Sequence, residues 1–367
     1  MVKLGIFCNF SYPHIGGTEE VLKNIAERMV NDYDFDVIVS SYSVDKYQIH
    51  KNVKYVKCLK GRDLIDDINS FDIIFVYSDS FWGFPSILKK IRFIEPKIFL
   101  APVGMYDLLG NPESFKIFKE NIEKFQIITH SNIYQDYKAC KENNFPVTVI
   151  PNGVNPDEFN DNCIDFRAEY KLYDKKVLLC VSNFFYGKGQ EYLPDIAAEL
   201  RDKHNFQDFK VVLISSSIKY PHERLFMNRC QQKFASLRVP YSFVRNASRE
   251  HVVGAFKQAD LFVFSSRKEV APIVILESMA AGTPWVSMDV GNVSYLNGGI
   301  VINNDKTDAK GYKIIDNLII EKYAENILSL LTNDELYKGL SSEGTKNVEK
   351  KYNWDKICKQ YYEIFTS

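Results

Sequence analysis

Short apolar runs alternate along this chain with segments whose apolar residues recur at helical spacing. Val2–Asn9 is mostly apolar, and Thr18–Val30 brings Val21, Leu22 and Ile25 onto one helical face. Strands that are apolar on both faces are typical of parallel sheets covered by helices on both sides. The alternation therefore predicts an α/β fold with doubly wound, Rossmann-like sheets. Six further runs in this half are predicted as strands: Phe35–Ser40, Val53–Cys58, Phe71–Tyr77, Ile98–Pro102, Phe125–Thr129 and Val147–Ile150.

The same alternation starts again after about residue 165, where Lys176–Val181 predicts a strand and Gly189–Leu200 a helix. A chain of 367 residues is too long for one ordinary core. We therefore expect two domains, over 1–165 and 166–350. The later strands are predicted at Phe209–Ser215, Tyr241–Val244, Leu261–Phe264, Trp285–Met288 and Gly299–Ile302. The later helices are predicted near 221–237, 249–258 and 273–281, and at Tyr323–Leu331 and Asp334–Glu349.

Charge and cysteine content argue against several classes of protein. The 46 Lys and Arg residues balance 47 Asp and Glu residues, which disfavours a general polyanion binder and a nucleic-acid acceptor. The seven cysteines are scattered and contain no C-x-x-C pair, so we expect neither a disulfide scaffold nor a zinc site. No apolar run approaches a membrane span, and the N-terminus does not resemble a signal peptide. These features predict a cytoplasmic protein.

Two glutamates lie eight positions apart after one of the predicted strands. Glu269 follows Leu261–Phe264 and its turn, and Glu277 lies about one turn into the helix that starts near Ile273. Ligands of open α/β sheets bind at this carboxyl edge, and free N–H groups at a helix start suit a phosphate or a sugar oxygen. A carboxylate accepts hydrogen bonds from two neighbouring hydroxyls. Each glutamate alone reads as a surface acid, but the spaced pair predicts a sugar or nucleotide site.

The segment Glu269-x7-Glu277, followed by Ser-Met-Ala-Ala-Gly-Thr-Pro, resembles the signature of retaining glycosyltransferases of the GT-B fold, in particular glycosyltransferase family four (glycosyl transferases group one). The resemblance covers nearly the whole chain. It implies two Rossmann-like domains whose parallel sheets face a central cleft, with a C-terminal helix over 351–367 completing the first domain. Four other segments agree with the family in order and spacing: Gly16-Gly17-Thr18-Glu19, Ile150–Phe159, Val181–Gly189 and Tyr352-Asn353-Trp354.

The resemblance implies a role for each matching residue. Glu277 would hold the ribose of a nucleotide-diphosphate sugar, and Glu269 would contact hydroxyls of the transferred sugar. Lys188 would neutralise the diphosphate leaving group, so Lys188 and Glu269 are the catalytic candidates. Gly16 and Gly17 would let the first loop approach the diphosphate closely. The backbone of the next segment would face the sugar and diphosphate: Val270, Ala271, Pro272 and Ile273.

One departure from the family removes a positive charge from the expected donor site. Asn183 stands where the family usually has an arginine, so we expect a cation on a nearby loop to compensate. Arg267 is the first candidate, and the others are Lys268, Arg245 and Arg249. Neither a metal nor a cofactor is expected, because a lysine, loop amides and a helix N-terminus can offset the leaving-group charge. No His or Cys cluster has the spacing of metal ligands.

The acceptor side carries weaker signals. His14 lies beside Gly16, and Tyr106 and Asp107 follow the predicted strand Ile98–Pro102, where the family commonly has a histidine. Aromatic and basic residues mix over 81–93, which fits either a peripheral contact at the inner face of a membrane or a solvated helix end. Candidate acceptors are a lipid-linked or polymeric glycan, a small metabolite and a protein.

We therefore expect a retaining glycosyltransferase of glycan biosynthesis that moves a sugar from a UDP- or GDP-sugar to an acceptor hydroxyl without a metal. Asn183 and the missing loop histidine leave open a catalytically weak nucleotide-sugar-binding or partner subunit of the same fold. A sugar-nucleotide epimerase is a third possibility. Turnover with and without an acceptor separates the three.

Overall fold

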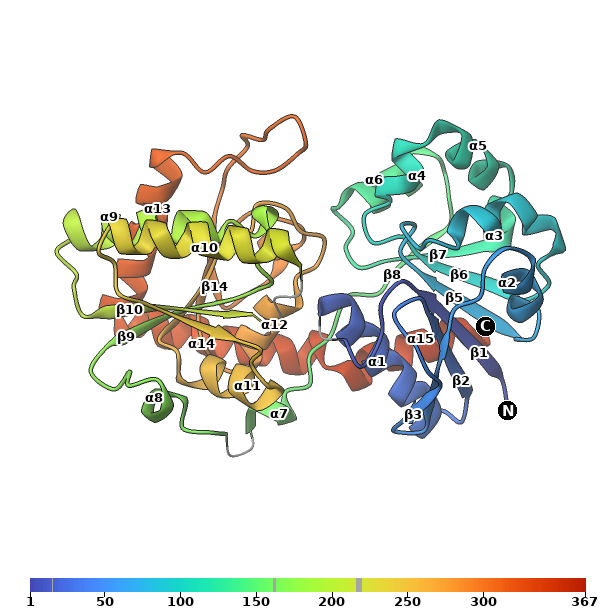
Figure 1. The fold of residues 1–367 in the computed structure, drawn as a ribbon, viewed down its shortest axis with the longest axis horizontal. Helices are drawn as coiled ribbons and strands as arrows, with labels where there is room; N and C mark the ends of the chain where they lie inside the picture. The colour runs from blue at the N-terminus through green and yellow to red at the C-terminus, as the bar shows by residue number, and fades with distance from the viewer. Residues whose placement is uncertain (15, 161–162, 216–219) are drawn as a thin grey trace. The chain divides into compact units, whose positions relative to one another are not determined.

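A computed structural model describes residues 1–14, 16–160, 163–215 and 220–367 (Figure 1). Its internal contacts divide the chain into two compact units. The first unit contains Met1–Asn152 and the terminal segment Trp354–Ser367, and the second contains Gly153–Asn353. Each unit is built around its own mainly parallel sheet, so the predicted α/β class with two doubly wound sheets is confirmed.

The first unit has an eight-stranded sheet in the order β3-β4-β2-β1-β5-β6-β7-β8. The edge strand β3 is antiparallel to β4, and the other neighbours are parallel. The direction of strand order reverses at β1, where β2 lies on one side and β5 on the other. The strands are β1 Lys3–Cys8, β2 Asp36–Ser41, β3 Gln48–His50, β4 Val53–Lys57, β5 Ile73–Tyr77, β6 Lys97–Ala101, β7 Phe125–Thr129 and β8 Val147–Val149.

Alternate residues of the central strands pack against helices on opposite faces of this sheet. Ile74 on β5 belongs to a buried cluster that includes Ile87 and Phe118 of α3 and α5. Phe75, the next residue, contacts Tyr361 and Phe365 of α15 instead. The helices of this unit are α1 Gly17–Asn31, α2 Gly61–Ile68, α3 Phe84–Lys90, α4 Tyr106–Gly110, α5 Pro112–Glu120, α6 Gln135–Glu142 and α15 Trp354–Thr366.

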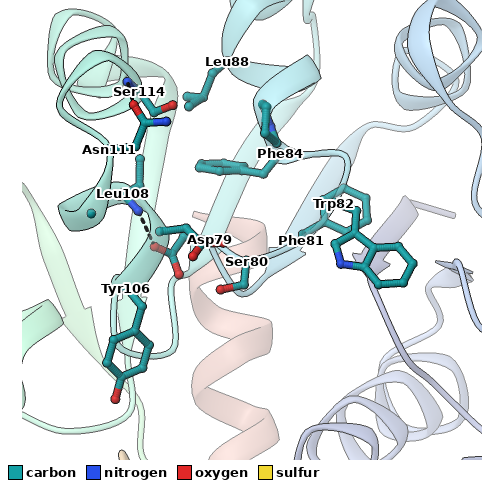
Figure 2. Close-up of a pocket in the computed structure, with 13 residues that line it drawn as sticks. Asp79, Ser80, Phe81, Trp82, Phe84, Leu88, Tyr106, Leu108, Asn111 and Ser114 are labelled. Carbon is teal, nitrogen blue, oxygen red and sulfur yellow. Dashed lines mark hydrogen bonds between the residues drawn. The ribbon is translucent and has the colours of Figure 1, made fainter. Parts of the chain in front are cut away.

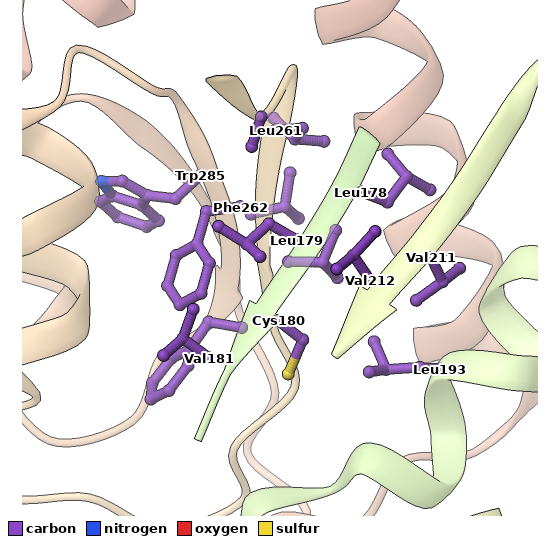
Figure 3. Close-up of a cluster of buried hydrophobic side chains, with 14 of the residues drawn as sticks. Leu178, Leu179, Cys180, Val181, Leu193, Val211, Val212, Leu261, Phe262 and Trp285 are labelled. Carbon is purple, nitrogen blue, oxygen red and sulfur yellow. The ribbon is translucent and has the colours of Figure 1, made fainter. Parts of the chain in front are cut away.

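The second unit has a six-stranded parallel sheet in the order β11-β10-β9-β12-β13-β14. Figure 3 shows its central strands, which carry Leu178, Val212 and Phe262 among the buried side chains. Apolar residues at the five positions of β9 that follow Lys176 explain why helices cover both faces of the sheet. The strands are β9 Lys176–Val181, β10 Phe209–Ser215, β11 Tyr241–Arg245, β12 Leu261–Phe264, β13 Trp285–Met288 and β14 Gly299–Ile302.

The helices of the second unit contact one another as well as the sheet. Helix α13 contacts both α9 and α14, and α12 contacts both α11 and α14. The helices are α7 Asp157–Asn160, α8 Phe166–Glu169, α9 Leu193–Asp202, α10 Pro221–Ser236, α11 Arg249–Gln258, α12 Ile273–Ala280, α13 Asn317–Thr332 and α14 Asp334–Asn347. Within the described residues, no helix is long and apolar enough to cross a membrane.

Three boundaries differ from the sequence predictions by more than a few residues. The helix predicted from Gly189 starts at Leu193, because Gly189 has a φ of +67° and the next residues form a short 3-10 turn. The helix predicted from Tyr323 starts at Asn317, where the side chain of Asp316 accepts a hydrogen bond from the Ile319 N–H. The segment 153–165, which we had assigned to the first domain, belongs to the second unit.

Candidate active site

A glycine-flanked lysine follows the end of β9. Lys188 lies between Gly187 and Gly189, and this loop is joined to the segment that follows the neighbouring strand β12. The Arg267 N–H donates to Gly187 O at 2.8 Å, and Ser265 Oγ donates to Lys188 O at 3.0 Å. A Cβ atom on Gly189 would lie 2.1 Å from Ser265 O. Glycine is therefore required here by the approach of the protein's own backbone.

The same junction brings together the two residues predicted to be catalytic. Lys188 Nζ donates to Glu269 Oε1 at 2.7 Å, and Ser266 Oγ donates to the same oxygen at 2.5 Å. Only 11% of the Glu269 side chain is exposed, compared with 29% for Lys188. An ammonium group has three donors and Glu269 uses one, so Lys188 can bind a further anion while it holds Glu269 in place.

The predicted donor loop leads from Glu269 into α12. The Asn292 N–H donates to Val270 O at 3.0 Å, and a Cβ atom on Gly291 would lie 2.4 Å from the same oxygen. Pro272, which follows Ala271, occupies the N-cap position of α12, and Ile273 is the first residue of the helix. The first-turn N–H groups of α12 are thus next to Glu269 in the sequence, as predicted.

Glu277, the second glutamate, takes part in a different ion-pair group. Arg249 Nη1 donates to Glu277 Oε1, and Arg249 Nε donates to Glu158 Oε2 at 2.9 Å. Glu277 is 5% exposed. Burial lowers the pKa of Arg249, but the carboxylates of Glu277 and Glu158 more than offset this effect and raise its pKa above the ordinary value. This group fixes the position of the α12 carboxylate.

The structure places Arg267 in an aromatic environment. Its guanidinium lies 4.6 Å from the ring centre of Tyr186, 5.6 Å from that of Tyr312 and 5.9 Å from that of Tyr192. Only 3% of Arg267 is exposed, and its Nε donates to Lys313 O at 2.6 Å. These contacts favour a role in fixing the loop beside Lys188. Direct binding of a diphosphate by Arg267 stays a prediction.

The other two predicted residues of the second unit lie at its surface. Asn183 is exposed, and its carbonyl accepts a hydrogen bond from Gln190 Nε2 at 2.8 Å. Arg245 is exposed at the end of β11, which is an edge strand separated from β9 by β10. Their assignment to a donor site stays a prediction.

The remaining predicted residues belong to the first unit. Gly16 is the N-cap of α1, and a Cβ atom on it would lie 2.4 Å from Glu19 Oε2; Gly17 is the first residue of that helix. The His14 N–H donates to Ser11 O at 3.0 Å. Tyr106 and Asp107 begin α4 and line a cavity described below.

Two residues of this site were not selected from the sequence: Ser266 and Glu158. Arg249 was predicted only as a possible compensating cation, and its pairing with Glu277 was not predicted. Ser266 is part of a Ser-Ser-Arg-Lys turn at a strand end, and this position could have suggested it as a residue near a ligand edge. Glu158 gives no such signal, because only the fold brings it to Arg249. Among the described residues, no group of three or more His, Cys, Asp or Glu side chains is placed to hold a metal ion.

Comparisons with known proteins agree with this architecture. Residues 164–347 match the family model described as glycosyl transferases group 1. The chain is 25% identical over 393 residues to an uncharacterised glycosyltransferase of Methanocaldococcus jannaschii, covering 96% of this chain and 94% of that protein. It is 22% identical over 397 residues to N-acetyl-alpha-D-glucosaminyl L-malate synthase of Bacillus anthracis, covering 99% and 96%.

Solved structures of low sequence identity share the complete fold. Anabaena HepE, solved in complex with UDP-glucose, matches with a TM-score of 0.79 at 14% identity over 100% of both chains. Sucrose-phosphate synthase from Thermosynechococcus elongatus matches with a TM-score of 0.78 at 16% identity, covering 100% of this chain and 98% of that one. The fold is therefore that of the GT-B glycosyltransferases.

The matched model covers half of the chain, and its residues include Lys188, Glu269 and Glu277. This chain belongs to the glycosyl transferases group 1 family, and it is a glycosyltransferase.

Proposed function

We propose that this enzyme transfers a sugar from a nucleotide-diphosphate sugar to an acceptor hydroxyl, with retention of configuration and without a metal ion. The observation that carries this proposal is the contact of Lys188 with Glu269 at 2.7 Å, with Glu269 shortly before the start of α12 in the sequence. It joins a cation to a carboxylate on the segment that leads into the helix N–H groups. Those groups suit the two halves of such a donor, a charged diphosphate and a hydroxylated ring.

In this mechanism Lys188 and the first-turn N–H groups of α12 stabilise the negative charge that develops on the diphosphate as it leaves. Glu269 accepts hydrogen bonds from hydroxyls of the transferred sugar and so orients its anomeric carbon. Glu277, held by Arg249, accepts hydrogen bonds from the ribose. Fixed protein charges would thus supply the electrostatic stabilisation that a metal provides in other transferases.

The donor that deserves the first test is a UDP-sugar. HepE, which shares the fold, was solved with UDP-glucose, and one relative is named for the transfer of N-acetylglucosamine. GDP-sugars are the alternative.

The chain's cysteines are all free thiols, which supports a reducing cytoplasmic compartment.

We place the acceptor on the first unit. The net charge of −1 argues against a nucleic-acid acceptor. A lipid-linked or polymeric glycan remains the candidate acceptor, and peripheral contact with a membrane stays part of the proposal. The family membership does not favour the alternatives of a partner subunit or an epimerase.

The experiment is a two-stage assay on the full chain. A thermal-shift screen against UDP, GDP, ADP and their sugars identifies the donor, since a ligand that binds the folded state raises the melting temperature. Turnover of that donor is then followed by NMR with and without EDTA, and the anomeric coupling of the product reports its configuration. Activity that EDTA leaves intact and an anomer matching the donor support the proposal. Loss of activity with EDTA, an inverted product, or an epimerised donor formed without acceptor would overturn it.

A further inference from the structure

The first unit contains a cavity of about 500 Å³ that the donor chemistry does not explain (Figure 2). Its wall is formed by the loop after β5, the start of α3, and the segment from α4 to the start of α5. The cavity therefore lies at the carboxyl ends of two neighbouring parallel strands, β5 and β6. This edge of an open α/β sheet is where ligands bind.

Hydrogen bonds hold the cavity's loop in a fixed position at the reversal of strand order. Asn9, which follows β1, donates from Nδ2 to Ser80 O at 2.8 Å and accepts from the Trp82 N–H at 2.9 Å. On the other side, the Asp79 N–H donates to Pro102 O at 3.2 Å. Hydrogen bonds thus fix the wall of the cavity beside the place where the strand order reverses, between β1 and β5.

Asp79 is an unusual residue in this wall because it is a carboxyl group with only 3% exposure. Its Oδ2 accepts a hydrogen bond from the Leu108 N–H at 2.8 Å (Figure 2). Its Oδ1 has no hydrogen-bond partner within the described part of the chain. A buried oxygen that lacks a donor is costly, and a ligand hydroxyl that reaches it would remove that cost.

The rest of the wall combines aromatic surface with negative charge. Trp82 is 64% exposed, whereas Phe84 is buried, and both line the cavity. The lining includes the carboxyls of Asp79 and Asp107, and no Lys, Arg or His occurs among the described residues that form it. Phosphate or carboxylate groups would be repelled here, while a ring with one apolar face and several hydroxyls matches both halves of the wall.

We propose that this cavity binds an uncharged pyranose of the acceptor, with its apolar face against the aromatic part of the wall and a hydroxyl donated to Asp79. This inference rests on the proposed function, because it names the class of acceptor that the transferase uses. It requires that any phosphate or carboxylate of the acceptor lie outside the cavity. The sugar can be free or the terminal residue of a glycan, and the two sources share this recognition.

Tryptophan fluorescence of the full chain tests the proposal without turnover. Trp82 is exposed, whereas Trp285 and Trp354 are 0% and 1% exposed, so a ligand in the cavity should perturb mainly Trp82. The probes are methyl glycosides of glucose, galactose, mannose and N-acetylglucosamine, the matching 6-phosphates, and a disaccharide of the best sugar. We expect a saturable emission change with at least one neutral glycoside and about tenfold weaker binding of its 6-phosphate. Tighter disaccharide binding indicates a glycan terminus as the source, and equal binding indicates a free sugar.

Two variants and one control complete the test. Asp79→Asn keeps an acceptor for the Leu108 N–H but loses the charge, and we expect about five- to tenfold weaker glycoside binding. Trp82→Phe should abolish the signal, and calorimetry should then still detect binding. Asp63→Asn, on the exposed start of α2, should match the wild type.

Binding of the nucleotide donor is measured on the same samples, so that the two proposals can fail separately. Saturable glycoside binding with no donor turnover leaves the cavity assignment intact and defeats the transferase mechanism. When the donor is turned over, any one of three results overturns the cavity assignment. These are no fluorescence change with any neutral glycoside, tighter binding of the 6-phosphates, and wild-type binding by Asp79→Asn.

Discussion

Lys188 donates a hydrogen bond to Glu269 at 2.7 Å although 81 positions of sequence separate them. The contact exists because β9 and β12 are neighbours in the sheet, so the loops that follow them meet at one edge. Ser266 donates to the same carboxylate oxygen at 2.5 Å. A loop cation and a largely buried acid therefore form one unit, and we expect them to act as one.

The first prediction concerns that unit. Lys188→Met and Glu269→Gln should each lower kcat/KM by about 10- to 150-fold, because each removes a charge-assisted hydrogen bond worth about 1.5–3 kcal/mol. The double variant should fall by less than the product of the single effects, since residues in contact are energetically coupled. Initial rates with the best donor measure all three. Lys203→Met, on the exposed residue after α9, is the control and should match the wild type. Strictly multiplicative losses would contradict the coupling.

The second prediction concerns Gly189. Gly189→Ala should lower the free energy of unfolding by about 2 kcal/mol or more, because the position has a φ of +67° and the new Cβ would meet Ser265 O. It should also reduce turnover by displacing Lys188. The matched control is Gly339→Ala in the exposed interior of α14, where a Cβ would meet nothing within 4 Å. That change should stabilise the protein by about 0.5–1 kcal/mol. Denaturant unfolding measures both, and equal effects would contradict the strain.

The third prediction concerns the support of Glu277. Arg249→Met should destabilise the protein by about 3 kcal/mol, because it leaves the carboxylate of Glu277 without this cation at 5% exposure. It should also weaken nucleotide binding, whereas Glu277→Gln should weaken that binding with a smaller loss of stability. Thermal unfolding and calorimetry separate the two effects. Arg229→Met on the exposed face of α10 should change stability by less than about 0.5 kcal/mol.

The fourth prediction is a pH dependence. Burial raises the pKa of Glu191 to about 7, so the folded state binds a proton more tightly than the unfolded state does. Stability must then fall as pH rises between the ordinary carboxyl pKa and about 7. Glu191→Gln should show no such loss. Its melting temperature minus that of the wild type should therefore increase between pH 5 and pH 8. The expected difference in unfolding free energy is about 1–3 kcal/mol. A constant difference across this range would contradict the assignment.

The sequence predicted most of the two sheets because their strands are apolar at nearly every position. Lys176–Val181 and Leu261–Phe264 have the predicted bounds. The antiparallel edge strand Gln48–His50 was not predicted, since its three residues show no apolar run. The boundary after Asn152 was predicted too late, at residue 165, although Ile150–Phe159 resembles the family's segment at the inter-domain boundary. Phe159 joins the second unit through Phe256, which is remote in the sequence.

The candidate site was predicted only as far as single residues allow. Lys188 and Glu269 carry recognisable sequence contexts, but their pairing depends on which loops the sheet brings together. Arg267 was selected for its charge and for its position on a loop near the expected donor site. Its burial among Tyr186, Tyr192 and Tyr312 comes from three separate segments, and spacing along the chain cannot reveal such an environment.

Because the terminal helix α15 belongs to the first unit, the two units can complete their folding only at different times. It packs against α1, where Arg28 Nε donates to Asp355 Oδ1 at 2.9 Å, and it places Phe365 against Phe99 of the first sheet. A nascent chain leaves the ribosome N-terminus first, so the second unit is complete before the first one receives its last helix. Part of one face of the first sheet, around Phe75 and Phe99, therefore stays uncovered until Trp354–Ser367 has been synthesised.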